Sequence, residues 1–172
     1  MSPSPDDITV SFSWRTERCF RRPRPAAVRK LALRAAELAG TGLDSENPLG
    51  VSFLSSKKMA EVNWDYLTHS GDTDVICFNY REAEDDFGAG VDILICPAFA
   101  LREATKRSLP FGREVTLYLV HGLLHAAGYD DLKPELKRKM RRAEKRVMTA
   151  LEKEFDLCSI FEYDGEMTEA EK

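Results

Sequence analysis

Histidine and cysteine are both scarce in this sequence of 172 residues, which contains three histidines and four cysteines. The cysteines are widely spaced and form no C-x-x-C pair, so neither a disulfide framework nor a thiolate zinc site is expected. No apolar run approaches the roughly 18 residues of a membrane-spanning helix. The first residues, MSPSPDD, also lack the cationic-then-apolar pattern of a signal peptide. We therefore expect a cytoplasmic protein.

The net charge of −4 provides no general attraction to nucleic acid, but the charges are unevenly distributed. Residues 15–34 contain one acid, Glu17, among eight arginines and lysines, and residues 133–146 contain two acids among another eight. Acidic residues gather instead at 82–86 and from Glu152 onward. This segregation favours a basic face that binds phosphates. Alternatively, each basic run is the solvated side of an amphipathic helix.

Hydrophobic periodicity and turn residues divide the chain into four strands and five helices. Strands are predicted where apolar residues alternate or run together, at 8–14, 48–54, 74–80 and 91–96. Helices are predicted after prolines or capping serines, at 25–39, 55–67 and 97–107, in the segment with the two clustered histidines, and from 134 to about 155. This order predicts an α+β fold, a small mixed β-sheet with packed helices. We expect one domain over residues 1–155 and an acidic C-terminal tail over 156–172.

Two of the three histidines, His121 and His125, are four residues apart, which places both imidazoles on one face of a helix. The surrounding segment is apolar nearly all round, which is typical of a buried central helix. Glu114 and Tyr118 extend the same polar stripe along the helix in steps of three or four residues. We expect this stripe to face a cleft.

The segment after the histidines can bring a third ligand to them. Asp131 lies six residues beyond His125, about 9 Å further along if the helix continued at about 1.5 Å per residue. Gly128 can end the helix by adopting a left-handed backbone at little cost, so that the chain folds back toward the imidazoles. Two histidines, one carboxylate and an open fourth position are typical of a catalytic zinc site, whose bound water ionises near a pH of about 7 and favours hydrolysis. Alternatively, the histidines are a core pair that is hydrogen-bonded to backbone or carboxylate groups.

Gly122 follows the first histidine directly. Most helical zinc peptidases carry a glutamate in this place as their general base. Because glycine has no side chain, peptide hydrolysis by that mechanism is disfavoured.

The segment HGLLHAAGYDD, residues 121–131, resembles the H-G-x-L-H-L-x-G-Y-D-H motif of the YbeY-type metallo-endoribonucleases, a family of bacterial rRNA maturation factors. Asp131 stands where the motif has its third metal-binding histidine. This replacement is similar to a variant branch of the family in which aspartate occupies that position.

A second similarity to this family lies upstream, from Asn63 to the strand at 91–96. Leu67 occupies the place of an arginine that is associated with activity in many members, and His69, in the same loop, resembles a histidine of the variant branch. Asn63 has two interpretations, a contact with RNA or the metal surroundings and a hydrogen bond that shapes the loop. For Thr73 and Asp74 we favour the structural interpretation, because such residues commonly fix turns.

The resemblance implies a zincin-like arrangement, with the metal in a groove between sheet and helices. It implies that His121, His125 and Asp131 bind one Zn²⁺ in a single-strand-specific endoribonuclease of rRNA processing, at the 3′ end of 16S rRNA, and of ribosome quality control. His69 and Asp130 are the candidates for the general acid. The implied partners are single-stranded rRNA and the ribosome or its small-subunit proteins, with no membrane partner. The alternative is a non-enzymatic ribosome-assembly factor that binds rRNA or a ribosomal protein and keeps a structural zinc.

Overall fold

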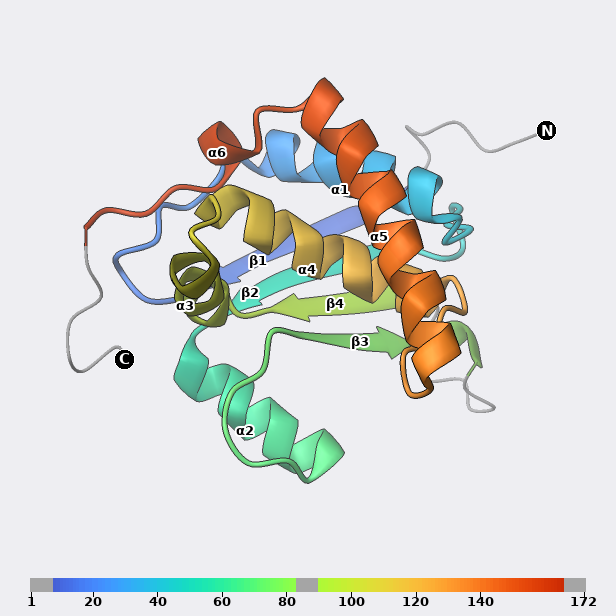
Figure 1. Ribbon diagram of the computed structural model, residues 1–172, viewed down its shortest axis with the longest axis horizontal. Coiled ribbons are helices and arrows are strands. Elements are labelled where there is room, and N and C mark those ends of the chain that lie inside the picture. Colours follow the sequence, from blue (N-terminus) through green and yellow to red (C-terminus); the bar gives the residue numbers. More distant parts are fainter. Residues whose placement is uncertain (1–7, 83–89, 166–172) are drawn as a thin grey trace.

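A single four-stranded sheet forms the base of the molecule. The computed structural model describes residues 8–82 and 90–165 (Figure 1). The strands lie in the order β1-β2-β4-β3 and are β1 (Val10–Arg15), β2 (Leu49–Leu54), β3 (Val75–Asn79) and β4 (Val91–Ile95). β1, β2 and β4 run parallel to one another, and β3 runs antiparallel to β4. The sheet is therefore small and mixed, as predicted, and β3 forms one of its edges.

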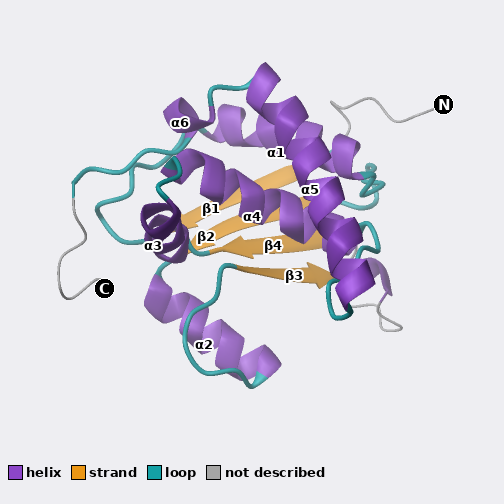
Figure 2. Ribbon diagram, in the orientation of Figure 1, coloured by secondary structure: helices purple, strands orange, loops and turns teal. Residues whose placement is uncertain are grey.

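The helices cover the sheet unevenly. They are α1 (Pro25–Ala39), α2 (Ser56–Leu67), α3 (Pro97–Arg107), α4 (Phe111–Ala126), α5 (Pro134–Glu154) and α6 (Leu157–Ile160), with a 3-10 turn, η2, at Tyr80–Glu82. α4 packs against β3 and β4, and α5 packs across α1 and α4. Figure 2 shows α2 apart from this group, on the β3 side of the sheet. The α+β class predicted from the sequence is confirmed.

Local sequence signals set most helix ends. Proline occupies the first turn of α1, α3 and α5, where its missing N–H leaves no bond unmade. The side chain of Ser55 accepts a hydrogen bond from the backbone N–H of Lys58 and so caps α2. Gly40 ends α1 with a φ of 73°, a conformation that costs glycine little. The predicted bounds of these helices are therefore confirmed to within a residue or so.

Gly122 allows α4 to lie close to the sheet. A Cβ atom at this position would stand 2.9 Å from Ile93 Cδ1 and 3.2 Å from Val75 Cγ2. Ile93 is fully buried, as are the neighbouring α4 residues Leu119 and Leu123. The absence of a side chain at Gly122 thus fixes the distance between α4 and the sheet, and with it the position of the adjacent His121.

The chain continues beyond α5 into a short helix that joins the core. Leu157 in α6 and Phe161 just after it are 5% and 2% exposed, and α6 packs against α4. The division into a domain and a tail at residue 155 stays a prediction. In the ranges that the structure describes, no helix combines the length and apolar character needed to cross a membrane.

Gly122→Ala should destabilise the fold by about 1 kcal/mol, because overpacking against Ile93 and Val75 costs about 1–3 kcal/mol and outweighs the gain of about 1 kcal/mol in helix propensity. Urea unfolding of this variant, of Ile93→Val and of the double variant measures the effect. The double variant should lose less stability than the sum of the two single variants, because valine lacks the Cδ1 atom that the new methyl group meets. Additive losses, or a stabilised Gly122→Ala protein, would contradict the packing argument.

Candidate metal centre

The C-terminal half of α4 presents the two clustered histidines on one face, as their spacing predicted. Their Nε2 atoms lie 2.9 Å apart, and the two rings meet edge to face with centroids separated by 4.5 Å. The side chains of His121 and His125 are 21% and 31% exposed. Both nitrogens are therefore accessible at the surface while their helix is buried.

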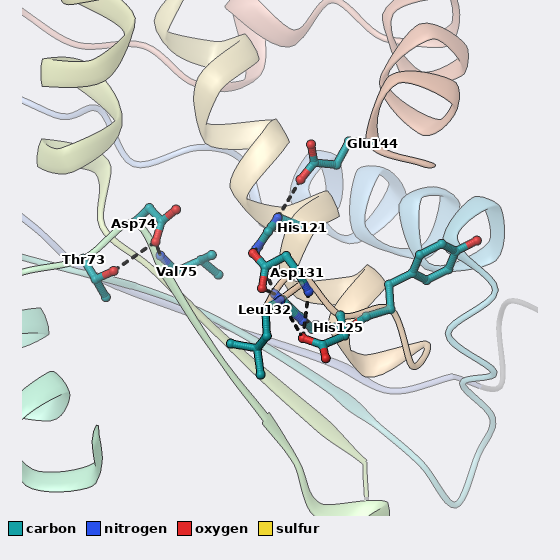
Figure 3. Close-up of polar contacts among 10 residues, drawn as sticks. Thr73, Asp74, Val75, His121, His125, Asp131, Leu132 and Glu144 are labelled. Atoms are coloured by element: carbon teal, nitrogen blue, oxygen red, sulfur yellow. Dashed lines mark hydrogen bonds and ion pairs between the residues drawn. The ribbon is translucent and has the colours of Figure 1, made fainter. Parts of the chain in front are cut away.

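α4 ends just after His125, which lets the chain turn back toward the two histidines. Gly128 has a φ of 94°, its N–H donates to His125 O, and the N–H of Tyr129 donates to Leu124 O, which is the hydrogen-bond pattern of a glycine-terminated helix. The returning chain places the carboxylate of Asp131 3.7 Å from His121 Nε2 and 3.9 Å from His125 Nε2 (Figure 3). The predicted helix stop and the predicted meeting of the three side chains are both confirmed.

The other ring nitrogen of each histidine is held by an acceptor. His121 Nδ1 lies 2.6 Å from Glu144 Oε1, and His125 Nδ1 lies 3.1 Å from the carbonyl oxygen of Tyr129. A carbonyl or ionised carboxylate can only accept, so each Nδ1 carries the hydrogen and each neutral ring turns its Nε2 lone pair toward the other. Two lone pairs at that separation repel each other unless a cation or a proton lies between them.

The three side chains therefore have the chemistry of a metal site. One ligand atom from each of His121, His125 and Asp131 can be chosen so that all lie within 4.8 Å of one another. Two neutral imidazoles and one carboxylate are a donor set that zinc accepts, and three protein ligands leave one position open. The residues present thus fit the metal that the sequence predicted. The alternative interpretation predicted hydrogen bonds to carboxylate or backbone groups, and the Nδ1 atoms make such bonds. It does not account for the second carboxylate, Asp131, which lies near both Nε2 atoms.

Glu144 is the part of the site that sequence analysis missed. It comes from α5, is 18% exposed, and joins α5 to His121 across 23 residues of sequence. In the sequence it stands out only as one of two acids in a basic run. A stronger signal was its place beside the apolar stripe of α5, next to the buried Ala143, where an acid needs a buried partner.

The polar stripe of α4 is accessible at one end only. Glu114 and Tyr118, which were expected to face a cleft with the histidines, are 0% and 5% exposed. α3 covers them: the Phe99 ring packs edge to face on Tyr118, and Arg107 lies 3.4 Å from Glu114. Burial, together with the charge of Glu114, raises the pKa of Tyr118, so its phenol stays neutral. The expectation that the whole stripe faces a cleft is therefore wrong for Glu114 and Tyr118, and only the histidine end is partly exposed.

The two candidate general acids lie in different surroundings. Asp130 Oδ1 accepts from the backbone N–H groups of Asp131 at 2.7 Å and Leu132 at 3.1 Å, which shapes the turn that presents Asp131. His69 is exposed in the loop after α2, where its backbone N–H donates to Asn63 O. Within the described ranges, no hydrogen bond or ion pair joins the His69 side chain to His121, His125 or Asp131.

The loop between α2 and β3 is held by its own polar residues. Asp74 Oδ1 accepts from Thr73 Oγ1 at 3.0 Å and from the backbone N–H of Val75 at 2.8 Å, which confirms the turn-fixing interpretation (Figure 3). Asn63 is 4% exposed, and its side chain donates to Gly71 O at 2.9 Å. Of its two interpretations, the contact supports the shaping of the loop.

Comparisons with known proteins agree with this geometry. A family model described as Endoribonuclease YbeY matches residues 21–152. Endoribonuclease YbeY of Macrococcus caseolyticus is 33% identical over 129 residues, which cover 72% of this chain and 82% of that protein. The protein of the same name from Symbiobacterium thermophilum is 30% identical over 139 residues, 77% of this chain and 89% of that one. The solution structure of TM1509 from Thermotoga maritima has a TM-score of 0.54 at 20% identity over 85% of this chain and 93% of that chain, which supports the fold alone.

Glu144→Gln should weaken zinc binding by about 10- to 100-fold, because the charge that orients and polarises His121 is lost. The measurement is competition with a chromophoric chelator at neutral pH. Glu135→Gln is the matched control, since Glu135 is an exposed acid on the same helix. Equal zinc affinities for the two variants would show that Glu144 does not support the site.

Glu144→Gln should also shift the pH dependence of zinc binding. Burial, the largest single influence, lowers the pKa of His121. The hydrogen bond and charge of Glu144, together with the charges of Asp74 and Asp131, raise it more, so the pKa lies above the usual value. Protonation of His121 therefore stabilises the metal-free fold below the unfolded-state pKa, and this stability is lost as the pH rises through the raised pKa. Zinc needs the deprotonated ring, so its affinity should fall as the pH drops through that pKa. In Glu144→Gln the fall should begin at lower pH, and an unchanged profile would contradict the assignment.

Proposed function

Because the chain belongs to the Endoribonuclease YbeY family, we propose that it is a zinc-dependent endoribonuclease that cuts single-stranded RNA. The observation that carries the proposal is the convergence of two Nε2 atoms and the Asp131 carboxylate. The proposed physiological reaction is rRNA processing at the 3′ end of 16S rRNA, together with ribosome quality control. Its proposed partners are single-stranded rRNA and the ribosome or small-subunit proteins.

In the proposed mechanism, His121, His125 and Asp131 hold one Zn²⁺. When bound, the ion supplies Lewis acidity, which lets water ionise at neutral pH and offsets charge on a phosphodiester. Glu144 and the Tyr129 carbonyl hold the hydrogen of each neutral ring at Nδ1, so that both Nε2 lone pairs are aimed at the same point. These residues are thus oriented before substrate binds, which reduces the reorganisation needed during reaction.

The oxygen that leaves phosphorus needs a proton, and His69 and Asp130 are the proposed carriers. Asp130 is adjacent to the ligand Asp131, and His69 lies on the loop that leads into β3. Histidine is the residue type that most often transfers protons in enzymes. His69 is therefore the stronger proposal for proton transfer, while the contacts of Asp130 support a role in the turn.

The charges of the two basic runs support RNA as the substrate class. In the first run, Arg21 forms ion pairs with Glu162 and Asp164. Arg34 forms ion pairs with Glu37 of its own helix and with Glu154 of α5. In the second run, on and just before α5, no lysine or arginine forms an ion pair with any residue that the structure describes. The cations of this second run thus remain available to phosphates.

A peptidase is less compatible with the packing at Gly122. The helical zinc peptidases place a glutamate after the first histidine, and any side chain here would meet Ile93 and Val75 within 3.2 Å. A general base at that position would crowd Ile93 and Val75, whose side chains would have to shift. The observation favours phosphodiester over peptide hydrolysis.

A non-enzymatic ribosome-assembly factor is the second candidate. Leu67, the last residue of α2, is 44% exposed, and this apolar residue contributes no cation to a scissile phosphate. A chain without that charge could bind RNA and keep its zinc without cutting. The distinction between the two functions therefore depends on cleavage itself.

Asp131→Ala should abolish cleavage, with a loss of at least about 100-fold in rate, because removal of a ligand leaves the zinc site incomplete. The measurement uses a single-stranded RNA that carries the 3′ end of 16S rRNA, with a duplex of the same sequence as the uncut control. Glu135→Gln, purified in parallel, controls for contaminating nuclease. RNA affinity and the melting temperature of Asp131→Ala should stay close to those of the wild type.

Equal trace cleavage by wild type and Asp131→Ala would contradict the enzyme and favour the binding role. In the same assay, His69→Gln tests the proton carrier. Its rate should fall, and the shape of the pH–rate profile should change, because the proposed proton carrier is lost. An unchanged pH profile would remove His69 from the mechanism.

A further inference from the structure

A basic hollow lies on the flank of α5 that faces away from the metal centre. It has a volume of about 310 Å³ and is lined by Tyr129, Lys139, Arg142, Ala143 and Arg146. Arg142 and Arg146 each stand two residues from Glu144, and at about 100° per residue they project from nearly the opposite side of the helix. α5 therefore supports the metal centre with one flank and lines a separate hollow with the other.

The charge of the hollow is entirely positive. Three of its lining residues are cations and none is an acid. Arg146 donates from Nη1 to the carbonyl oxygen of Leu38 at 2.9 Å, at the end of α1, which holds its guanidinium in place. Lys139 and Arg142 are exposed, and neither makes a hydrogen bond or an ion pair within the described parts of the chain. The hollow thus offers one ordered and two free cations to an anionic ligand.

Tyr129 connects the hollow to the metal centre. It lines the hollow and packs partly buried against the core, while its carbonyl oxygen accepts from His125 Nδ1. It is also two residues from Asp131. A ligand that contacts the Tyr129 ring is therefore held on the same short loop that carries one metal ligand and orients another.

We propose that this hollow binds one nucleotide of the RNA strand, away from the scissile bond. Lys139, Arg142 and Arg146 bind its phosphate, and the Tyr129 ring stacks on its base. The proposal rests on the proposed function and adds where the strand is held. The volume of the hollow is at the lower end of ligand cavities, which span roughly 300–1,000 Å³, so the hollow accommodates a single nucleotide of the strand.

The combination of side chains favours RNA over an acidic peptide. Proteins that hold single strands pair cations for the backbone with aromatic rings for the bases. An acidic peptide would use the three cations but would gain little from Tyr129. The Tyr129 ring should therefore contribute to the affinity for RNA and not to the affinity for an acidic peptide.

The test measures binding of a labelled single-stranded RNA of about ten nucleotides to metal-free protein over a range of salt concentrations. Lys139→Ala and Arg142→Ala should each weaken binding and reduce the salt slope by about 0.7 for each phosphate that the variant no longer neutralises. Arg138→Ala and Lys145→Ala are matched controls, because they remove the same charge from exposed sites on α5 outside the hollow. The controls should reduce affinity and slope less than the hollow variants do, because they lie outside the hollow.

Variants of Tyr129 test the stacking contact. Tyr129→Leu should weaken RNA binding by roughly five- to a hundredfold, whereas Tyr129→Phe should bind like the wild type. Against a strand of the same length without bases, Tyr129→Leu and wild type should bind equally. Thermal melting of each variant checks that the fold is kept, and the comparison with phenylalanine separates loss of the ring from loss of packing.

Three results would overturn the proposal. In the first, the hollow variants and the two controls lose affinity equally. In the second, Tyr129→Leu weakens binding of the baseless strand as much as that of RNA. In the third, polyglutamate displaces RNA with no dependence on Tyr129, which would assign the hollow to an acidic protein.

Failure of this proposal is distinguishable from failure of the proposed function. If zinc-loaded wild type cuts RNA and the hollow variants bind and cut it equally well, the hollow is excluded and the enzyme stands. If zinc-loaded wild type cuts no RNA but metal-free binding still depends on Tyr129 and Arg142, the nucleotide site stands without the nuclease.

Discussion

Two hydrogen bonds to the Nδ1 atoms of His121 and His125 determine what the candidate centre can do. One acceptor, Glu144, comes from a different helix, and the other is the backbone of Tyr129, four residues beyond His125. Because both acceptors hold the hydrogen at Nδ1, the Nε2 lone pairs must face the space that Asp131 also enters. Without these bonds the same three side chains would form an ordinary polar cluster.

The burial of α4 makes this arrangement rigid. Gly122 lets the helix approach β3 and β4 closely, and α3 covers Glu114 and Tyr118. Of the polar stripe of α4, only the histidine end is partly exposed, so a close-packed core supports the centre on its buried side. Such support holds ligand geometry within the narrow limits that metal chemistry needs.

The two basic runs differ in how far neighbouring acids neutralise them, although the protein as a whole is acidic. Glu162, Asp164 and Glu154 neutralise part of the first basic run, whereas the cations of the second run form no ion pair in the described ranges. α5 can then serve two purposes, since Glu144 on one flank orients a metal ligand and the cations on the other flank line a hollow. A basic face for RNA therefore depends on which acids fold against which cations, rather than on net charge.

The sequence by itself determined the features that depend on near neighbours. The spacing of the histidines, the stop at Gly128, the cap at Ser55 and the alternation of the strands act over a few residues, so each could be predicted with its bounds. Only the tertiary structure decided that Glu144 orients His121, that Tyr118 is buried and that α6 joins the core. These outcomes depend on contacts between segments far apart in the chain, and no local pattern encodes which distant side chain will cover or bind a given residue.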